Sequence, residues 1–365
     1  MKAIVDQFDV PECFLSAESY GSGHINQTFW VKTLPAQSRT YILQKINHRI
    51  FKNIPKLMEN ICRVSLHLRG KIAKAGGDPD REALTVIPTR KGALFYQDPE
   101  GNFWRMYIFI ENTRSYDIVS TEHQAFEGGK TFGRFQGFLD DLPGEPLFET
   151  IPHFHNIDSR FALFQSACQQ DPQRRLKEIA AEVDFVQQSY PSMRLVLELG
   201  ASKKIPLRVT HNDTKFNNVL LDFEDQGLCV IDLDTVMPGY LHYDFSDSIR
   251  TVTNTAAEDE ADLSKIDMNL KLFEAYSRGF LSQVGPRLNE AEWASLGSSA
   301  KLLPFMIGLR FLTDYLNGDT YFKIKFPLHN VRRARAQFQL TRQIEKQESN
   351  IFKWIEFLEK AHGGV

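Results

Sequence analysis

The stretch of the sequence with the strongest chemical signature is LRVTHNDTKFNNVLLDFEDQGLCVIDLDTV, just past the middle of the chain. His211, Asp213 and Asn218 form an H-x-D-x-x-x-x-N pattern, and Asp232 and Asp234 follow within one hairpin's length. The apolar runs VLLDF and LCVIDL flank an acidic turn and predict a β-hairpin. The loop before this hairpin and the end of its second strand therefore each carry a carboxylate.

This spacing suits phosphoryl transfer, which needs positioning and charge neutralisation more than covalent help from the protein. We expect Asp213 to orient and deprotonate an acceptor hydroxyl as it attacks. Asn218 and Asp232 would offer oxygens to Mg²⁺, which takes its remaining ligands from phosphates and water. Lys215 would neutralise charge on the transferring group, or it is a solvated surface lysine. The alternative for the whole pattern is a polar turn whose Asp and Asn side chains cap the backbone.

Three further residues are expected to support this loop rather than to react. Asp244, in LHYDFSDSIR, is predicted to begin a helix, with Asp247 beside the first turn, where negative charge suits the helix dipole. A buried Asp244 would anchor the catalytic loop through its backbone or through His211. His211 and Asp234 are assigned the same supporting role.

A glycine turn near the N-terminus is the second candidate site. Gly21, Ser22 and Gly23 would let backbone N–H groups approach the phosphates of a nucleotide, although a plain hairpin turn needs the same residues. His24 and Asn26 follow and are predicted to reach nucleotide or acceptor. A lone histidine is, however, more often a structural residue than a functional one.

The elements that must position these residues fall into two regions. Strand-like runs separated by turns fill the first 110 residues, and they are interrupted by LMENICRVSLHLRG, in which Leu57, Ile61, Val64 and Leu68 mark one helix face. Helical periodicity dominates afterwards, with predicted helices near 157–170, 175–189, 262–284, 290–317 and 329–361. We therefore predict an α+β, bilobal fold: an N-terminal nucleotide-binding lobe (1–110), a hinge (111–117) and a mainly helical catalytic and substrate lobe (118–365).

Composition narrows the function classes. The chain has 365 residues, 42% hydrophobic and 24% charged, and a net charge of −3. No basic field is present to recruit nucleic acid or a membrane surface, and no apolar run is long enough to span a bilayer. The four scattered cysteines form no CxxC pair and predict neither disulfides nor a zinc site. We expect a cytoplasmic protein with a small-molecule substrate and no obligate protein partner.

The motifs together resemble those of the aminoglycoside phosphotransferase and choline kinase-like family, whose members share the protein-kinase-like fold. Longer blocks are similar to the bacterial N-acetylhexosamine 1-kinase branch and cover nearly the whole chain in order; they include YGSGHINQTFWV, YILQKIN, IENTRSY, PLRVTHNDTKFNNVLLD, VIDLDTVMPGYLHYDFSDSIR and GLRFLTDYLNGDTYF. The resemblance implies transfer of the ATP γ-phosphate to the 1-hydroxyl of GlcNAc or GalNAc, with ATP and Mg²⁺ as cofactors.

The resemblance also assigns residues beyond the hairpin. The segment 109–112 becomes the part that meets adenine, so Ile110 and Glu111 are predicted nucleotide-binding residues. Arg310, in GLRFLTDY, is similar to a sugar-binding residue, and a sugar pocket would also use hydrogen-bonding groups such as Asp314. A salt bridge on a helix face is the alternative for Arg310.

One departure from protein kinases concerns the third strand, where those enzymes carry a lysine that holds the phosphates. Here YILQKIN has Gln44 at the expected position and Lys45 next to it. Because strand neighbours point to opposite faces, only one of them can face ATP, and we favour Gln44. Glu59 is then a weak candidate for the helix glutamate that pairs with this lysine in protein kinases. The second departure is Asp232-Leu233-Asp234 in place of Asp-Phe-Gly, which is typical of the small-molecule branch.

Two alternative functions stay open on the sequence. A kinase of another small alcohol, such as choline, an aminoglycoside or another sugar, would have the same fold. A choline pocket should present aromatic faces around a quaternary ammonium, whereas a sugar pocket needs hydrogen-bonding groups. A non-catalytic nucleotide-binding pseudokinase is the third possibility, and Gln44 is its only support.

Overall fold

The computed structural model of the protein describes residues 1–21, 25–35 and 38–363, so the predicted sites Ser22, Gly23 and His24 lie outside the described residues. Two compact units are each assembled from separate chain segments. Unit 1 comprises Met1–Arg114, Phe138–Pro152 and Leu220–Met237, and unit 2 comprises Ser115–Gly137, His153–Val219 and Pro238–Val365. The first junction falls inside the predicted hinge. The segments 138–152 and 220–237, which the prediction assigns to the second lobe, group with the N-terminal sheet in unit 1.

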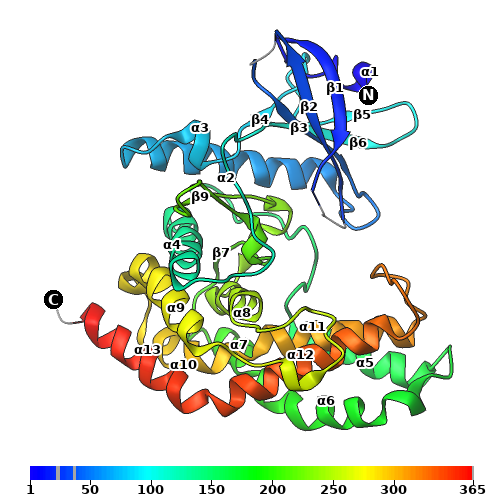
Figure 1. Cartoon of the computed structure of the whole chain (residues 1–365), viewed down its shortest axis with the longest axis vertical. Coiled ribbons are helices and arrows are strands. Elements are labelled where there is room, and N and C mark those ends of the chain that lie inside the picture. Colours follow the sequence, from blue (N-terminus) through cyan, green and yellow to red (C-terminus); the bar gives the residue numbers. More distant parts are fainter. Residues whose placement is uncertain (22–24, 36–37, 364–365) are drawn as a thin grey trace. The chain divides into compact units, whose positions relative to one another are not determined.

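Unit 1 is built on a six-stranded antiparallel sheet with the order β1-β2-β3-β6-β4, in which β5 also pairs with β6 (Figure 1). The strands are β1 (Cys13–Ser19), β2 (Gln27–Leu34), β3 (Tyr41–Ile46), β4 (Val86–Ile87), β5 (Tyr96–Gln97) and β6 (Phe103–Ile108). The helices are α1 (Lys2–Val5), α2 (Ile54–Lys74) and α3 (Pro79–Glu82). An N-terminal antiparallel sheet with one long helix is the arrangement that the sequence predicts.

Alternation along the strands divides the sheet into two faces. Leu43, Trp104 and Met106 are buried on one face in a hydrophobic cluster with the N-terminal segment, including Val5 and Phe8. Helix α2 begins after Asn53, whose side chain accepts a hydrogen bond from the Lys56 amide as an N-cap. Its predicted apolar face is confirmed, since the four residues that mark it are all buried: Leu57, Ile61, Val64 and Leu68.

The predicted hairpin forms as β8 (Val219–Leu221) and β9 (Gly227–Val230), followed by the 3₁₀ turn η3 (Leu233–Thr235). From Leu220 onward it belongs to unit 1. The physical reason is its set of buried contacts within that unit: Asp234 ion-pairs with Arg105 of β6, and Asn60 of α2 donates a hydrogen bond to the Val236 carbonyl at 3.2 Å. Sequence proximity to Asp213 therefore does not decide which unit this segment joins.

Unit 2 is mainly helical. Its longer helices are α4 (Glu122–Leu139), α5 (Ile157–Gln170), α6 (Ala180–Met193), α7 (Leu195–Ala201), α8 (Leu241–Val252), α9 (Leu270–Val284), α10 (Glu290–Ser299), α11 (Leu302–Leu316), α12 (His329–Lys346) and α13 (Glu348–Gly363), the last two residues of α4 lying in unit 1. Short 3₁₀ turns are η1 (Leu176–Ile179), η2 (Phe216–Asn218), η4 (Leu263–Lys265) and η5 (Gly285–Arg287). The strands β7 (Arg208–Thr210) and β10 (Met237–Gly239) form a two-stranded sheet.

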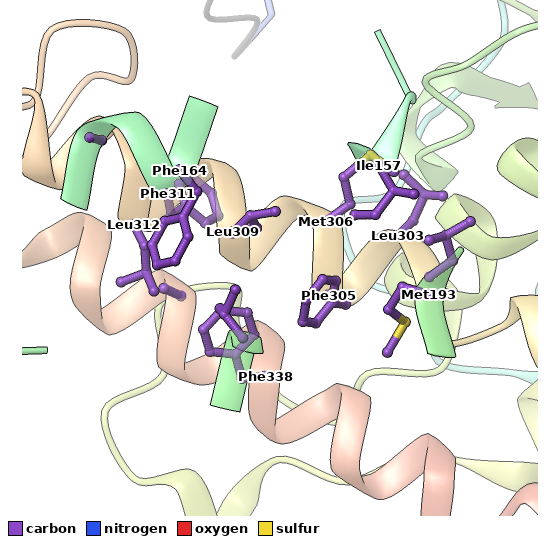
Figure 2. Close-up of a cluster of buried hydrophobic side chains, with 14 of the residues drawn as sticks. Ile157, Phe164, Met193, Leu303, Phe305, Met306, Leu309, Phe311, Leu312 and Phe338 are labelled. Carbon is purple, nitrogen blue, oxygen red and sulfur yellow. The ribbon is translucent and has the colours of Figure 1, made fainter. Parts of the chain in front are cut away.

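The hydrophobic core of unit 2 centres on α11, which packs against α5 and α12. Figure 2 shows Phe305, Met306 and Leu309 of α11 among side chains that include Phe164 of α5 and Phe338 of α12. Gly308 lets Phe338 approach, since a Cβ there would lie 2.5 Å from a ring atom of Phe338. This core holds the C-terminal half of α11, and hence Arg310, in a defined orientation.

The predicted helix 157–170 matches α5, but the three longest predictions are wrong as continuous helices. The segments 262–284, 290–317 and 329–361 each contain two separate helical elements. Pro304 explains the break between α10 and α11. A proline has no N–H and would clash with the carbonyl four residues earlier, so it is tolerated only in the first turn of a new helix. In the described part of the chain, no helix has the length and apolarity needed to cross a bilayer.

Candidate functional site

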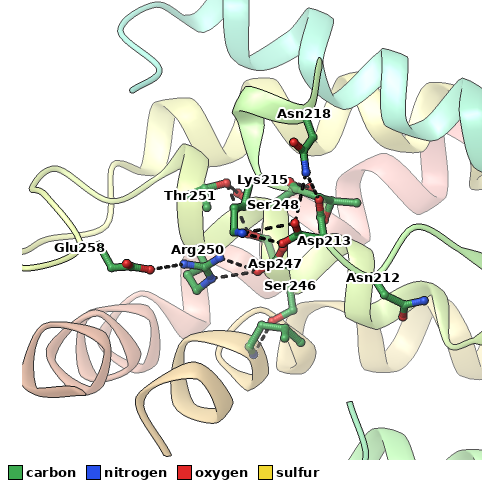
Figure 3. A network of polar contacts seen from close by, with 12 residues as sticks. Asn212, Asp213, Lys215, Asn218, Ser246, Asp247, Ser248, Arg250, Thr251 and Glu258 are labelled. Carbon is green, nitrogen blue, oxygen red and sulfur yellow. Dashed lines mark hydrogen bonds and ion pairs between the residues drawn. The ribbon is translucent and has the colours of Figure 1, made fainter. Parts of the chain in front are cut away.

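In unit 2, the loop that follows β7 brings three of the predicted site residues together. The Lys215 Nζ lies 2.9 Å from Asp213 Oδ1, and the Asn218 Nδ2 donates to the Asp213 carbonyl at 2.8 Å (Figure 3). The 3₁₀ turn η2 places Asn218 one turn after Lys215, because the Asn218 amide donates to the Lys215 carbonyl at 2.9 Å. The five-residue spacing between Asp213 and Asn218 therefore returns the second side chain to the first.

The charges around Asp213 decide its protonation state. Burial by itself raises the pKa of a carboxyl group, but the charge of Lys215 and its hydrogen bond outweigh burial and hold the pKa of Asp213 below its ordinary value. Burial likewise opposes the charge of Lys215, and the Asp213 carboxylate raises the pKa of that amine. Both groups are therefore charged near neutral pH, with Asp213 free of a proton.

Asp244 anchors this loop from helix α8. Its carboxylate accepts hydrogen bonds from the His211 amide at 2.8 Å and the Asn212 amide at 2.7 Å, and its carbonyl accepts one from the Thr214 hydroxyl at 2.6 Å. Gln136 of α4 donates to the same carboxylate. This is the backbone anchor expected of Asp244, although α8 begins at Leu241, three residues earlier than predicted. Its effect on catalysis stays a prediction.

A buried ion pair that the sequence analysis missed lies beside the loop. Asp247 and Arg250 sit one turn apart on α8, with Nη2 2.8 Å from Oδ1, and the two side chains are only 3% and 4% exposed. Arg250 also lies 3.3 Å from Glu258. Figure 3 shows Asp247 next to Lys215 and Asp213, and its charge contributes to the raised pKa of Lys215. The available signal was the i, i+3 spacing of opposite charges on one helix.

In unit 1, Asp232 and Asp234 occupy a strained turn. Asp232 has a left-handed backbone (φ 61°, ψ 60°), a conformation that costs a non-glycine residue about 1–2 kcal/mol. Asp234 is buried, ion-pairs with Arg105, and accepts a hydrogen bond from the Asn26 Nδ2 at 2.7 Å. Asn26 also bonds within unit 1 through the other end of its side chain, since Oδ1 accepts from the Asn47 amide at 2.9 Å. Contact of Asn26 with substrate stays a prediction.

The structure places Gln44 and Lys45 on opposite faces of the sheet, and which of them faces ATP stays a prediction. Gln44 lies on the face of the sheet that carries Arg105, whereas Lys45 lies on the opposite face, 6.0 Å from the centre of the Trp104 ring. Glu59, on α2, ion-pairs with Lys56 at 2.8 Å and with neither of these two residues. The lysine–glutamate pair of protein kinases therefore has no counterpart in these residues.

The predicted adenine-contacting segment is an irregular stretch after β6. The Ile110 carbonyl accepts a hydrogen bond from the Thr113 hydroxyl at 2.9 Å, and Glu111 accepts one from the Thr40 hydroxyl at 3.2 Å. Asn112 has a positive φ of 56°. Gly21, the one described residue of the predicted glycine turn, also has a positive φ of 77° with open space where a Cβ would stand. Contact of these residues with nucleotide stays a prediction.

Arg310 lies in a cluster of aromatic side chains in unit 2. Its guanidinium stands 5.2, 5.8 and 5.6 Å from the ring centres of Phe154, Tyr321 and Phe322. We call these four residues the Arg310 cluster. Within the described residues Arg310 has neither an ion pair nor a hydrogen bond, so the helix-face salt bridge considered above is absent.

The Arg310 cluster is connected to the Asp213 loop. The ring of His155 lies 4.4 Å from that of Phe154, and its Nε2 donates to the Asn212 carbonyl at 2.8 Å. Burial lowers the pKa of His155 to about 4, so it is neutral. A second cation, Arg160, donates to the Phe154 carbonyl at 3.0 and 2.8 Å. Burial, together with the charge of Arg310, lowers the pKa of Arg160 to about 10.

Asp314 needs a correction as a substrate-binding residue. Its buried carboxylate accepts hydrogen bonds from the backbone N–H groups of Thr320, Tyr321 and Phe322 at 2.9, 2.8 and 3.0 Å, and from Asn330 at 2.9 Å. Four donors fill the acceptor capacity of a carboxylate. Asp314 therefore shapes the loop that carries Tyr321 and Phe322 and has no acceptor site left for a ligand.

The donor atoms fit a magnesium ion that keeps phosphate and water ligands. The Asn218 Nδ2 is used by Asp213, which leaves Oδ1, the atom that a metal takes, without a hydrogen bond among the described residues. No group of three His, Cys, Asp or Glu side chains in the described ranges could hold a metal on its own. Such a group is not needed, since Mg²⁺ in phosphoryl-transfer sites takes one or two protein ligands.

Comparison with known proteins agrees with this chemistry. Residues 16–278 match the model of the phosphotransferase enzyme family, APH, and thus cover more than half of the chain. The chain belongs to this family. As a phosphotransferase it has the protein-kinase-like fold, with the antiparallel sheet and helical part described above.

Solved structures show the same fold at low sequence identity. An aminoglycoside phosphotransferase from Alicyclobacillus acidocaldarius has 10% identity and a TM-score of 0.61, with 98% of this phosphotransferase and 96% of that chain covered. A microcompartment-associated aminopropanol kinase has 17% identity and a TM-score of 0.56, with 96% and 97% covered. An amicoumacin kinase in complex with AMP-PNP, Ca²⁺ and Ami has 12% identity and a TM-score of 0.56, with 92% of this phosphotransferase and 90% of that chain covered.

Proposed function

We propose that this phosphotransferase is an ATP- and Mg²⁺-dependent kinase of a small neutral sugar, which transfers the γ-phosphate to the 1-hydroxyl of an N-acetylhexosamine, GlcNAc or GalNAc. The coarser part of this proposal is a kinase that acts on a small molecule. Two of the structures named above support it, since one is an aminoglycoside phosphotransferase and another is an aminopropanol kinase. The finer part, a neutral sugar, rests on the charge of the Arg310 cluster and on the blocks of sequence that resemble sugar 1-kinases.

The observation that carries the acceptor class is that Arg310 has no acidic partner in the described residues while Arg160 adds a second positive charge nearby. Aminopropanol, choline and aminoglycosides are cations, which two guanidinium groups repel. The aromatic faces that a quaternary ammonium would use already lie against Arg310 itself. A neutral sugar, in contrast, gains from guanidinium N–H donors and from aromatic faces.

The residues of the loop then have defined tasks. The ionised Asp213 carboxylate accepts the proton of the 1-hydroxyl as that oxygen attacks the γ-phosphorus and the bond to the β–γ bridging oxygen breaks, releasing ADP. Asp244 keeps Asp213 in place by holding the two amides before it. Lys215, paired with Asp213, is available to neutralise phosphoryl charge. Asn218 and Asp232 would hold Mg²⁺, which when bound neutralises phosphate oxygens.

A direct assay tests the proposal. The protein is incubated with Mg-ATP and, separately, GlcNAc, GalNAc, glucose, galactose, choline and aminopropanol; ADP release gives kcat/KM, and ³¹P NMR locates the phosphate. We expect a preference for the N-acetylhexosamines and an anomeric phosphate. Activity confined to choline or aminopropanol would refute the sugar assignment, and no ADP release with any acceptor would favour the pseudokinase.

An Arg310→Met variant sharpens the test. Removing a charged hydrogen-bond donor to a neutral ligand costs about 1.5–3 kcal/mol, or roughly 10- to 100-fold in KM for the sugar. ATP KM should stay unchanged. Arg335→Met is the matched control, because Arg335 lies on α12 and pairs with Glu182 at 2.6 Å. An equal sugar KM in Arg310→Met and Arg335→Met would argue against the Arg310 cluster as the acceptor site.

A further inference from the structure

Unit 1 contains a fully buried guanidinium whose contacts converge on the Asp232–Asp234 turn. Arg105 of β6 is 1% exposed and ion-pairs with Asp234, whose side chain is 4% exposed. Burial alone would lower the pKa of Arg105, but the charges of Asp234 and Asp232 help to raise it above its ordinary value. The arginine is therefore a permanent positive charge beside this turn. In the sequence, the sign of this buried charge is an arginine within the otherwise apolar strand segment FWRMYIFI.

Gln44 fixes the orientation of this arginine. The two residues are direct cross-strand partners in the β3–β6 register. The Gln44 Oε1 accepts from Arg105 Nε at 2.9 Å, and its Nε2 donates to the Thr28 hydroxyl at 3.0 Å. Both ends of the Gln44 amide are thus used inside the sheet. The position that carries the lysine in protein kinases is occupied by a residue that orients a cation on the neighbouring strand.

The turn that Arg105 contacts is one that needs support. Asp232 has the left-handed backbone described above, and Asp234 would be a costly buried charge without a partner. Two more contacts hold the same turn from within unit 1: the Thr150 hydroxyl donates to the Asp234 carbonyl at 2.8 Å, and Asn26 donates to its carboxylate. Among the described residues, Arg105 is the buried cation that pairs with Asp234.

We propose that Arg105 is the positioning cation of the metal-binding turn: it holds Asp234, and thereby keeps Asp232 in the conformation that binds Mg²⁺, while Gln44 holds Arg105. This proposal rests on the function proposed above. Arg105 acts through Asp234 and does not touch substrate, since its guanidinium is buried and bonded to Gln44 and Asp234. Its loss should therefore weaken the metal-dependent part of nucleotide binding, not nucleotide binding in general.

Calorimetric titration with AMP-PNP, with and without Mg²⁺, tests this without an acceptor or turnover. The variants are Arg105→Lys, which keeps the charge but loses the planar fork, and Gln44→Leu, which leaves the ion pair but removes the Nε acceptor. Changes in residues that orient a metal ligand typically cost about 10- to 100-fold in metal affinity. We expect the gain in affinity on adding Mg²⁺ to fall by ~10-fold in Arg105→Lys and less in Gln44→Leu.

Lys45→Gln is the matched control, because Lys45 is the strand neighbour on the opposite face, near Trp104. It should bind AMP-PNP with and without Mg²⁺ as the wild type does. Hydrogen exchange at residues 232–236 supplies a readout that works without nucleotide. Faster exchange there in Arg105→Lys and Gln44→Leu, with unchanged exchange in α8, is the expected result.

Four outcomes separate this inference from the proposed function. Equal losses of affinity with and without Mg²⁺, or wild-type behaviour of Arg105→Lys, would overturn the positioning role alone. If Lys45→Gln shows the defect expected of Arg105→Lys, the defect does not depend on the sheet face that carries Arg105, and the positioning role is overturned as well. An inactive acceptor panel combined with the predicted Mg²⁺-dependent defects would refute the sugar kinase assignment and support the role of Arg105.

Discussion

Each unit of the phosphotransferase contains a buried arginine–aspartate pair next to predicted catalytic or metal-binding residues, and the two pairs are built differently. In unit 2, Asp247 and Arg250 are three residues apart on α8. In unit 1, Arg105 and Asp234 are 129 residues apart and come from β6 and from the turn after β9. The local pair is fixed once α8 forms, whereas the distant pair joins two segments. A buried charge of the second kind can therefore control the conformation of a turn that carries predicted metal-binding residues.

The largest expected effect comes from breaking the distant pair. Arg105→Met should lower the free energy of unfolding by about 3–5 kcal/mol, because it leaves a buried carboxylate without a partner. Arg105→Met/Asp234→Leu should recover most of this loss, since apolar side chains have no desolvation penalty. Urea denaturation measures both. The same cycle with Arg250→Met and Asp247→Leu should give a smaller coupling, because Glu258 provides Arg250 with a second acidic partner. Equal coupling energies in the two cycles would contradict the comparison.

Asp213→Asn separates chemistry from the structural role of the nearby pair. We expect kcat to fall by about 100-fold or more, because the asparagine cannot accept the proton of the acceptor hydroxyl. AMP-PNP binding and the urea midpoint should change little. Asp184→Asn, on the exposed face of α6, is the control. A fully active Asp213→Asn would show that the proton acceptor has been assigned wrongly.

Asp314→Asn tests whether the proposed acceptor site in unit 2 depends on the conformation of the loop that carries Tyr321 and Phe322. The asparagine can no longer accept from all three backbone N–H groups of Thr320, Tyr321 and Phe322, which should cost roughly 1–3 kcal/mol of stability. Because Tyr321 and Phe322 belong to the Arg310 cluster, KM for the sugar should rise while KM for ATP stays constant. A change confined to ATP KM would place this loop outside the acceptor site.

The smallest effect at neutral pH concerns the charge of Asp213. Lys215 lowers the pKa of this carboxyl group, so its stabilising contribution is present above the pKa of the unfolded chain and is lost as pH falls through the lower folded-state value. In Lys215→Met, burial is no longer opposed by this amine, and the acid limb of the kcat/KM profile should move to higher pH. An unmoved acid limb would mean that Asp213 is not the titrating group.

Much of the site was predictable because it is local in sequence. The H-x-D-x-x-x-x-N spacing and the short turn η2 bring Asn218 back to Asp213, so that pattern alone indicates their proximity. Asp244 was predictable as an anchor because a buried carboxylate beside a loop needs N–H donors. Harder to predict is which protein groups a polar side chain bonds to. Asn26 and Asp314 have the residue types of ligand-binding groups, but Asn26 bonds to Asp234 and to the Asn47 amide, and four protein donors fill the carboxylate of Asp314.

The sequence by itself therefore determined the antiparallel sheet with its helix, the hairpin and the proximity of Asp213 and Asn218, since periodicity and short spacings act over a few residues. Only the tertiary structure decided that most of the hairpin joins unit 1, that Gln44 bonds to Arg105, and that Arg310 lies among aromatic rings with no acidic partner in the described residues. Such contacts depend on which distant segments are buried together, because burial makes an unpaired charge or amide costly and so selects its partner.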